Sequence, residues 1–103
     1  MGPVSRQVFT LQLEYAATGE GVRIWTMVVV DPSEAGARDR FWTTCFGGST
    51  SAREYFGPGL EVTPGFDRTR LRGLTDEFLD RLEMRARTSG AFAYQTYWSY
   101  NLS

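Results

Sequence analysis

Residues 8–30 read VFTLQLEYAATGEGVRIWTMVVV, and this stretch decides the class of fold. Its first half alternates apolar and polar side chains, which is typical of a strand with one buried face. The small, Gly-bearing segment 16–21 predicts a hairpin loop, and a second strand follows from Val22 to Val30. That strand ends in three consecutive Val, so we expect it to lie inside the sheet. The alternating apolar positions of the first strand are Phe9, Leu11, Leu13 and Tyr15.

The last third of the chain predicts one long helix followed by an aromatic strand. Thr75 is a natural N-cap for a helix over 74–87, with acidic residues in its first turn. Gly90 suits the end of that helix, and residues 91–102 then alternate as a strand does. Leu74 and Leu79 have the spacing of a hydrophobic staple. The expected apolar face of the helix is Phe78, Leu79, Leu82 and Ala86.

Residues 31–66 predict a mixed, partly irregular segment. Residues 32–40 favour a short helix, whereas 41–46 have the aromatic and β-branched composition of a third strand. A helical turn ending at Phe56 and a brief extended piece at 60–62 complete the segment.

These elements predict an α+β fold in one domain over residues 1–103, with 1–7 as an N-terminal extension. We expect a small antiparallel sheet made from the 8–30 hairpin and the C-terminal strand. One main helix, 74–87, packs across one face of that sheet.

The composition excludes several classes of function. The chain has no His and one Cys, so it cannot hold a catalytic triad, a Cys–His dyad or an ordinary zinc site. We therefore predict no catalytic residue, no metal and no cofactor. The start of the chain is polar and no apolar run is long enough for a bilayer, so we expect no membrane partner. The expected location is the cytoplasm, or a virion or other assembly.

Three local features have ordinary structural explanations. The Gly-rich turn 47–51 resembles an anion-binding turn but lacks the Lys and the spacing of a phosphate-binding loop. Asp31, Glu34 and Asp39 match no calcium-loop spacing. Cys45 has apolar neighbours, so we expect it to be a small buried hydrophobe.

Arg68, Arg70 and Arg72 alternate along the chain and could form a basic stripe. Such a stripe would suit nucleic-acid phosphates or another anion. Acidic residues lie among these Arg and the net charge of the chain is −1, so nucleic-acid binding is not favoured.

The aromatic C-terminal strand is the most informative feature. Its aromatic side chains fall on both faces, and one face would enter the core with Phe92 and Trp98. The other face is either an exposed binding surface or is covered by segment 32–66. Tyr, Trp and Arg are enriched among the residues that dominate binding energy. The predicted partner-binding residues are Tyr94, Tyr97, Trp98, Tyr100, Arg68, Arg70 and Arg72.

These features favour a non-catalytic protein–protein interaction module. An assembly subunit, which would form homo-oligomers, and an inhibitor or immunity-type protein fit equally well, and the Lys-free composition suits a phage or bacterial origin. Two alternatives remain: a nucleic-acid- or anion-binding module that uses the Arg stripe, and a small oligomeric enzyme that uses carboxylates and Tyr.

Overall fold

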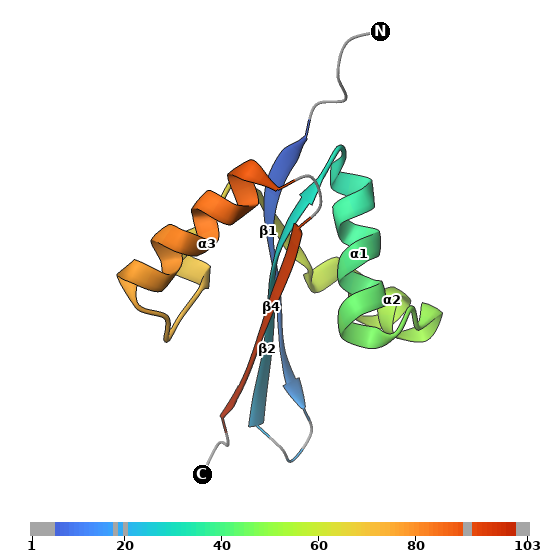
Figure 1. The fold of residues 1–103 in the computed structure, drawn as a ribbon. Helices are drawn as coiled ribbons and strands as arrows, with labels where there is room; N and C mark the ends of the chain where they lie inside the picture. The colour runs from blue at the N-terminus through green and yellow to red at the C-terminus, as the bar shows by residue number, and fades with distance from the viewer. Residues whose placement is uncertain (1–5, 18, 20, 90–91, 101–103) are drawn as a thin grey trace, which may run out of the picture.

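The computed structural model describes residues 6–17, 19, 21–89 and 92–100, and it has an α+β fold (Figure 1). Four antiparallel strands form one sheet in the order β3-β1-β2-β4, with helices on both faces. The strands are β1 (Gln7–Ala17), β2 (Gly21–Asp31), β3 (Glu61–Pro64) and β4 (Phe92–Tyr100). The α-helices are α1 (Glu34–Phe46), α2 (Thr50–Phe56) and α3 (Asp76–Thr88), and short 3-10 turns lie at Gly57–Gly59 and Arg68–Arg70.

The predicted N-terminal hairpin is confirmed. Strands β1 and β2 pair along their whole length, from Gln7 opposite Asp31 to Ala17 opposite Gly21. The period-two pattern places Phe9, Leu11 and Leu13 in the core. Strand β2 lies inside the sheet, between β1 and β4, and its consecutive Val are buried on both faces.

Helices α1 and α2 cover one face of the sheet. Ser33 begins α1, because its side chain accepts a hydrogen bond from the Gly36 N–H at 3.0 Å. The prediction of a strand at 41–46 is wrong, since these residues continue the helix. Ala37, Phe41 and Cys45 recur every four residues, and that helical spacing buries one stripe against β1 and β2.

Helix α3 covers the opposite face. The predicted cap is confirmed, because the Thr75 hydroxyl accepts from the Phe78 N–H at 3.1 Å. Leu79, Leu82 and Ala86 pack on Val28 and Val30 of β2. Leu74 packs against the same cluster as Leu79, as a hydrophobic staple requires. The expected C-terminal role of Gly90 lies outside the described residues.

The sheet is therefore covered on both faces, whereas the sequence predicted one main helix on one face. The physical reason is that β2 is apolar on both sides, with Met27 and Val29 facing α1 and with Val28 and Val30 facing α3. Segment 31–66 supplies the second cover, mostly as helix, and so is more regular than predicted.

The helices cover only one half of the strands. In Figure 1 the sheet is seen close to edge-on with β4 in front, and α1 and α3 flank its upper part. The far end of the hairpin and the C-terminal half of β4 extend below both helices. This arrangement leaves the last residues of β4 without a covering helix.

Candidate protein interface at the β4 edge

The two edges of the sheet differ in how open they are to another strand. Strand β3 is four residues long, begins with Glu61 and ends at Pro64. Short length, charge and Pro are the features that protect edge strands from pairing with other chains. Strand β4 is nine residues long, contains no charged residue and no Pro, and pairs with a described strand only on its β2 side. Its outer edge is therefore an unprotected row of backbone donors and acceptors.

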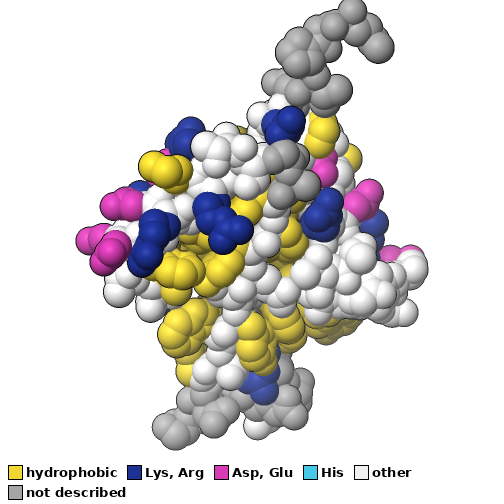
Figure 2. All heavy atoms as spheres, in the orientation of Figure 1, with side chains coloured by type: hydrophobic (Ala, Val, Ile, Leu, Met, Phe, Trp, Pro, Cys, Tyr) yellow, Lys and Arg dark blue, Asp and Glu magenta, His cyan; other side chains and the backbone are white. Residues whose placement is uncertain are grey.

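Three large aromatic side chains of β4 are exposed. The exposed fractions are 47% for Tyr97, 44% for Trp98 and 42% for Tyr100. The expectation that Trp98 enters the core is wrong, because Trp98 is exposed and belongs to the C-terminal half of β4, which extends beyond α3. Figure 2 looks onto this edge and shows hydrophobic side chains along it, with Arg side chains beside those under α3.

The register of β4 on β2 separates these aromatics by face. Tyr97 lies opposite Trp25, on the side of α1, and their ring centroids are 4.4 Å apart. Trp25 in turn lies 5.4 Å from Phe46, so the exposed Tyr97 ring is anchored to the core. An anchored aromatic loses little conformational entropy on binding, which favours its use in an interface.

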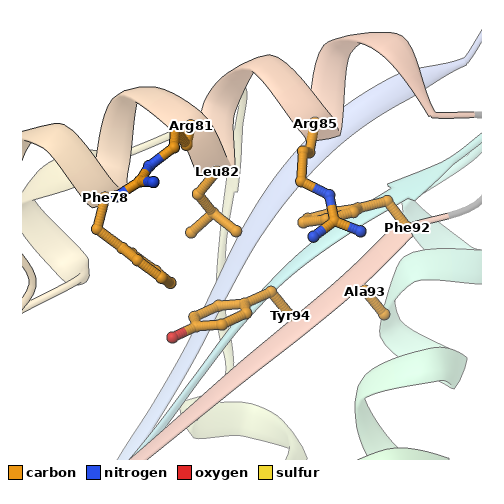
Figure 3. Close-up of a pocket in the computed structure, with 7 residues that line it drawn as sticks. All are labelled: Phe78, Arg81, Leu82, Arg85, Phe92, Ala93 and Tyr94. Atoms are coloured by element: carbon orange, nitrogen blue, oxygen red, sulfur yellow. The ribbon is translucent and has the colours of Figure 1, made fainter.

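A cavity of about 590 Å³ lies between α3 and the N-terminal half of β4 (Figure 3). Phe78 and Leu82 face Tyr94 across it, and Arg85 reaches down beside Phe92. Ala93, which lies between Phe92 and Tyr94 in β4, also lines it. We call this cavity the α3–β4 groove, and it is lined by Phe78, Arg81, Leu82, Arg85, Phe92, Ala93 and Tyr94.

A second, smaller cavity of about 230 Å³ brings two of the predicted Arg to the aromatic strand. Arg70 and Arg72 line it together with Trp98 and Tyr100. The Trp98 ring lies against Gly73, where an added Cβ would be 2.5 Å from the ring. This contact orients Trp98 even though it is exposed.

The Arg stripe is not one continuous basic surface. Arg68 pairs with Asp80 at 2.5 Å and with Glu83 at 3.1 Å, away from Trp98. Its hydrogen bonds to these two acids raise the pKa of Arg68, and those from Arg87 and Arg68 lower the pKa of Glu83.

Arg70 is neutralised as well. Its guanidinium lies 2.5 Å from Glu61 and 3.5 Å from Asp67, and it donates to the Gln12 side chain at 2.7 Å. Of the three Arg, Arg72 alone has no ion pair with a described residue. Little positive charge is left for phosphate groups.

The acidic residues that suggested a metal have structural partners. Asp31 accepts from the Ser33 N–H at 3.0 Å, Glu34 pairs with Arg38, and Asp39 lies 2.6 Å from Arg53. In the part of the chain that the structure describes, no group of three His, Cys, Asp or Glu is arranged to hold a metal ion.

The other local features also have structural explanations. Ser49 caps α2, because its hydroxyl accepts from the Ala52 N–H at 3.2 Å, so the 47–51 turn is a helix start. Cys45 packs against the α1 side of the core, and burial raises the pKa of its thiol to about 12. None of the described helices combines the length and the apolar character that a bilayer span requires.

Comparison with protein-family models, curated proteins and solved structures found no match for this chain. The interface is therefore inferred from its geometry alone.

Sequence analysis missed the α3–β4 groove. It placed Phe78 in the apolar face of the helix, but the structure leaves Phe78 at the rim of the groove, 37% exposed. The sequence feature that could have indicated the groove is the width of the apolar helix face, since the adjacent residues Phe78 and Leu79 cannot both point at the centre of the sheet. Arg81 and Arg85, three and seven positions after Phe78, continue the same rim.

Proposed function

We propose that this protein is a non-catalytic protein-binding module that takes a partner strand onto the outer edge of β4. The observation that carries the proposal is the edge itself, nine residues without charge or Pro, which holds three exposed aromatics. Strand addition derives affinity from main-chain hydrogen bonds and specificity from pockets for alternate side chains. The α3–β4 groove supplies such a pocket beside Phe92 and Tyr94.

The neighbouring chemistry supports binding over catalysis. The side chains that line the α3–β4 groove are apolar, aromatic or Arg, so a substrate there would meet no carboxylate and no thiol. The ion pairs of Arg68 and Arg70 likewise weaken the nucleic-acid alternative. An assembly subunit and an inhibitor of phage or bacterial origin, in the cytoplasm or in an assembled particle, both fit this proposal.

The test compares proteins retained by the immobilised chain from an extract of the cells that produce it. Thr96→Lys places a charge in the middle of β4, where it opposes pairing with another strand. Tyr55→Ala is the matched control, because Tyr55 is exposed on α2, away from this edge. We expect wild type and Tyr55→Ala to retain the same partner, either another protein or further copies of the chain, and Thr96→Lys to lose it.

Equal retention by Thr96→Lys and wild type, or no retained protein and no self-association, would overturn the proposal. Circular dichroism of each variant checks that the sheet is intact, so that a loss of binding reports on the edge.

A further inference from the structure

We propose that the strand added to β4 is β4 of a second copy, related by a two-fold axis through Thr96. This inference rests on the proposed function and names its partner. The two sheets then join into one antiparallel sheet across the axis. An interface of this kind uses the same surface on both copies, so β4 must be complementary to itself.

The sequence of β4 has that self-complementarity. It reads FAYQTYWSY, and pairing it with its own reverse places each residue opposite a similar or compatible one. Phe92 meets Tyr100 and Tyr94 meets Trp98. On the other face, the small residues Ala93 and Ser99 meet, and Gln95 meets Tyr97. Thr96 lies on the axis and meets Thr96 of the second copy.

This register suits both faces of the sheet. On the α3 side it makes four aromatic pairs, two at each end, around a central pair of Thr. Aromatic and Thr–Thr cross-strand pairs each contribute about 0.2–1 kcal/mol relative to Ala pairs. No like charges face each other across the axis, since β4 carries none.

The register also brings aromatic residues of the second copy next to the α3–β4 groove. Trp98 of the second copy lies beside Tyr94, and its Tyr100 lies beside Phe92, on the side of the sheet that α3 covers. Tyr94 and Phe92 line the groove, so these aromatic pairs form at its β4 wall. Arg85 reaches down into the same groove beside Phe92, whereas Arg81 runs along α3 toward Phe78 (Figure 3). A guanidinium over an aromatic face is attracted to it.

The partial covering of the sheet makes this geometry sterically complementary. The N-terminal half of β4 lies under α3, and its C-terminal half extends beyond that helix. Antiparallel pairing sets the bare half of one copy against the covered half of the other. Each copy thus supplies both a covered half and an uncovered half of β4 that match each other, which favours a second copy over a foreign strand.

Cysteine cross-linking tests the register in the full chain with Cys45→Ala as background. Directly opposed residues have Cα atoms about 4.5–5.5 Å apart, within the range of a disulfide. Thr96→Cys should give a covalent dimer by itself, without mixing with a second variant. Ala93→Cys and Ser99→Cys should give one only when mixed, because each faces the other across the axis. Hydrogen-bonded and non-hydrogen-bonded pairs alternate along the strands, so the Thr96 pair and the Ala93–Ser99 pair are of different kinds. One of the two therefore has the Cα–Cα distance that suits a disulfide better.

The predicted result is a dimer in solution, with at least one of these cross-links and none in a Tyr55→Cys control. A chain that stays at 11.6 kDa at every concentration overturns the inference, as does a dimer that forms neither cross-link. The proposed function survives those results if the extract experiment shows a different protein lost with Thr96→Lys. The proposed function fails together with the β4–β4 dimer if no protein binds the outer edge of β4.

Discussion

The contact between Gly73 and Trp98 shows how a single residue orients one side chain of the candidate interface. Gly73 has φ +79°, which side chains disfavour, and the Trp98 ring occupies the space of its missing Cβ. Gly73→Ala should cost about 1–2 kcal/mol from the backbone alone, with a further loss from displacing the ring. Gly48→Ala is the matched control, because Gly48 has φ +77° with open space around it.

Urea denaturation of both variants measures the difference. We expect Gly73→Ala to be the less stable variant and to change the tryptophan fluorescence of the folded protein. Equal destabilisation by the two substitutions, with unchanged fluorescence, would show that Gly73 does not position Trp98.

Cys45 should be unreactive in the folded chain. Burial raises the pKa of its thiol from 9.0 to about 12, so almost no thiolate is present near neutral pH. A thiol reagent at pH 8 should label it at least tenfold faster in denaturant than in buffer. Comparable rates in the two conditions would place Cys45 at the surface.

The same shift has a consequence for stability. The unfolded chain loses the thiol proton near pH 9, while the folded chain keeps it to about 12. The free energy of unfolding therefore falls as the pH rises through that window. Below pH 9 both states are protonated, and the thiol has no effect on the pH dependence. Cys45→Ala should remove this part of the alkaline loss, which denaturation at pH 8 and pH 10 measures.

At the scale of elements, α3 has a buried stripe and a groove rim on adjacent faces of the helix. Leu82 is buried against the sheet, so Leu82→Ala should cost about 2–5 kcal/mol of folding stability. Phe78 lies at the groove rim with its ring 5.8 Å from Tyr94, and Phe78→Ala should cost about 1 kcal/mol. We expect Phe78→Ala to weaken self-association at least tenfold with the fold retained.

Thermal denaturation and the concentration dependence of the solution mass separate the two effects. If Phe78→Ala unfolds the chain as Leu82→Ala does, the rim is part of the core. Unchanged association in Phe78→Ala would mean that the rim of the groove takes no part in the proposed dimer.

Elements with one strong periodicity were predictable from sequence. The hairpin and α3 follow from alternation, capping and charge in the first turn, and both are confirmed. The helical structure of residues 41–46 was not predictable, because two patterns conflict there. Their aromatic and β-branched composition favours a strand, whereas Ala37, Phe41 and Cys45 have helical spacing. In this segment the burial of one helical stripe outweighed local propensity.

The candidate site was predictable only in part. The exposure of Tyr97 is one of the two outcomes left open for its face, whereas Tyr100 lies on the face that was expected to enter the core and is exposed as well. The α3–β4 groove was not predictable, because its walls come from two elements and depend on how far α3 reaches along β4. The separation of Arg68 from Arg72 depends on the 3-10 turn that follows Asp67.

At the scale of the whole molecule, the partial cover of the sheet connects fold to function. A sheet covered along its whole length would need no partner, whereas this one leaves aromatic surface at one end and a groove at the other. Large exposed apolar patches are rare on proteins that act alone. Because the paired surfaces are mostly apolar, we expect the dimer to persist at high salt.

The most direct measurement is the solution mass of Thr96→Lys and Thr96→Glu, separately and mixed, by light scattering. Like charges directly opposite each other oppose strand pairing, and opposite charges favour it. The two-fold axis through Thr96 predicts twice 11.6 kDa for wild type, 11.6 kDa for each variant alone, and the dimer mass again for the mixture. A monomeric wild type, or variants that dimerise alone as well as they do together, would contradict pairing through β4.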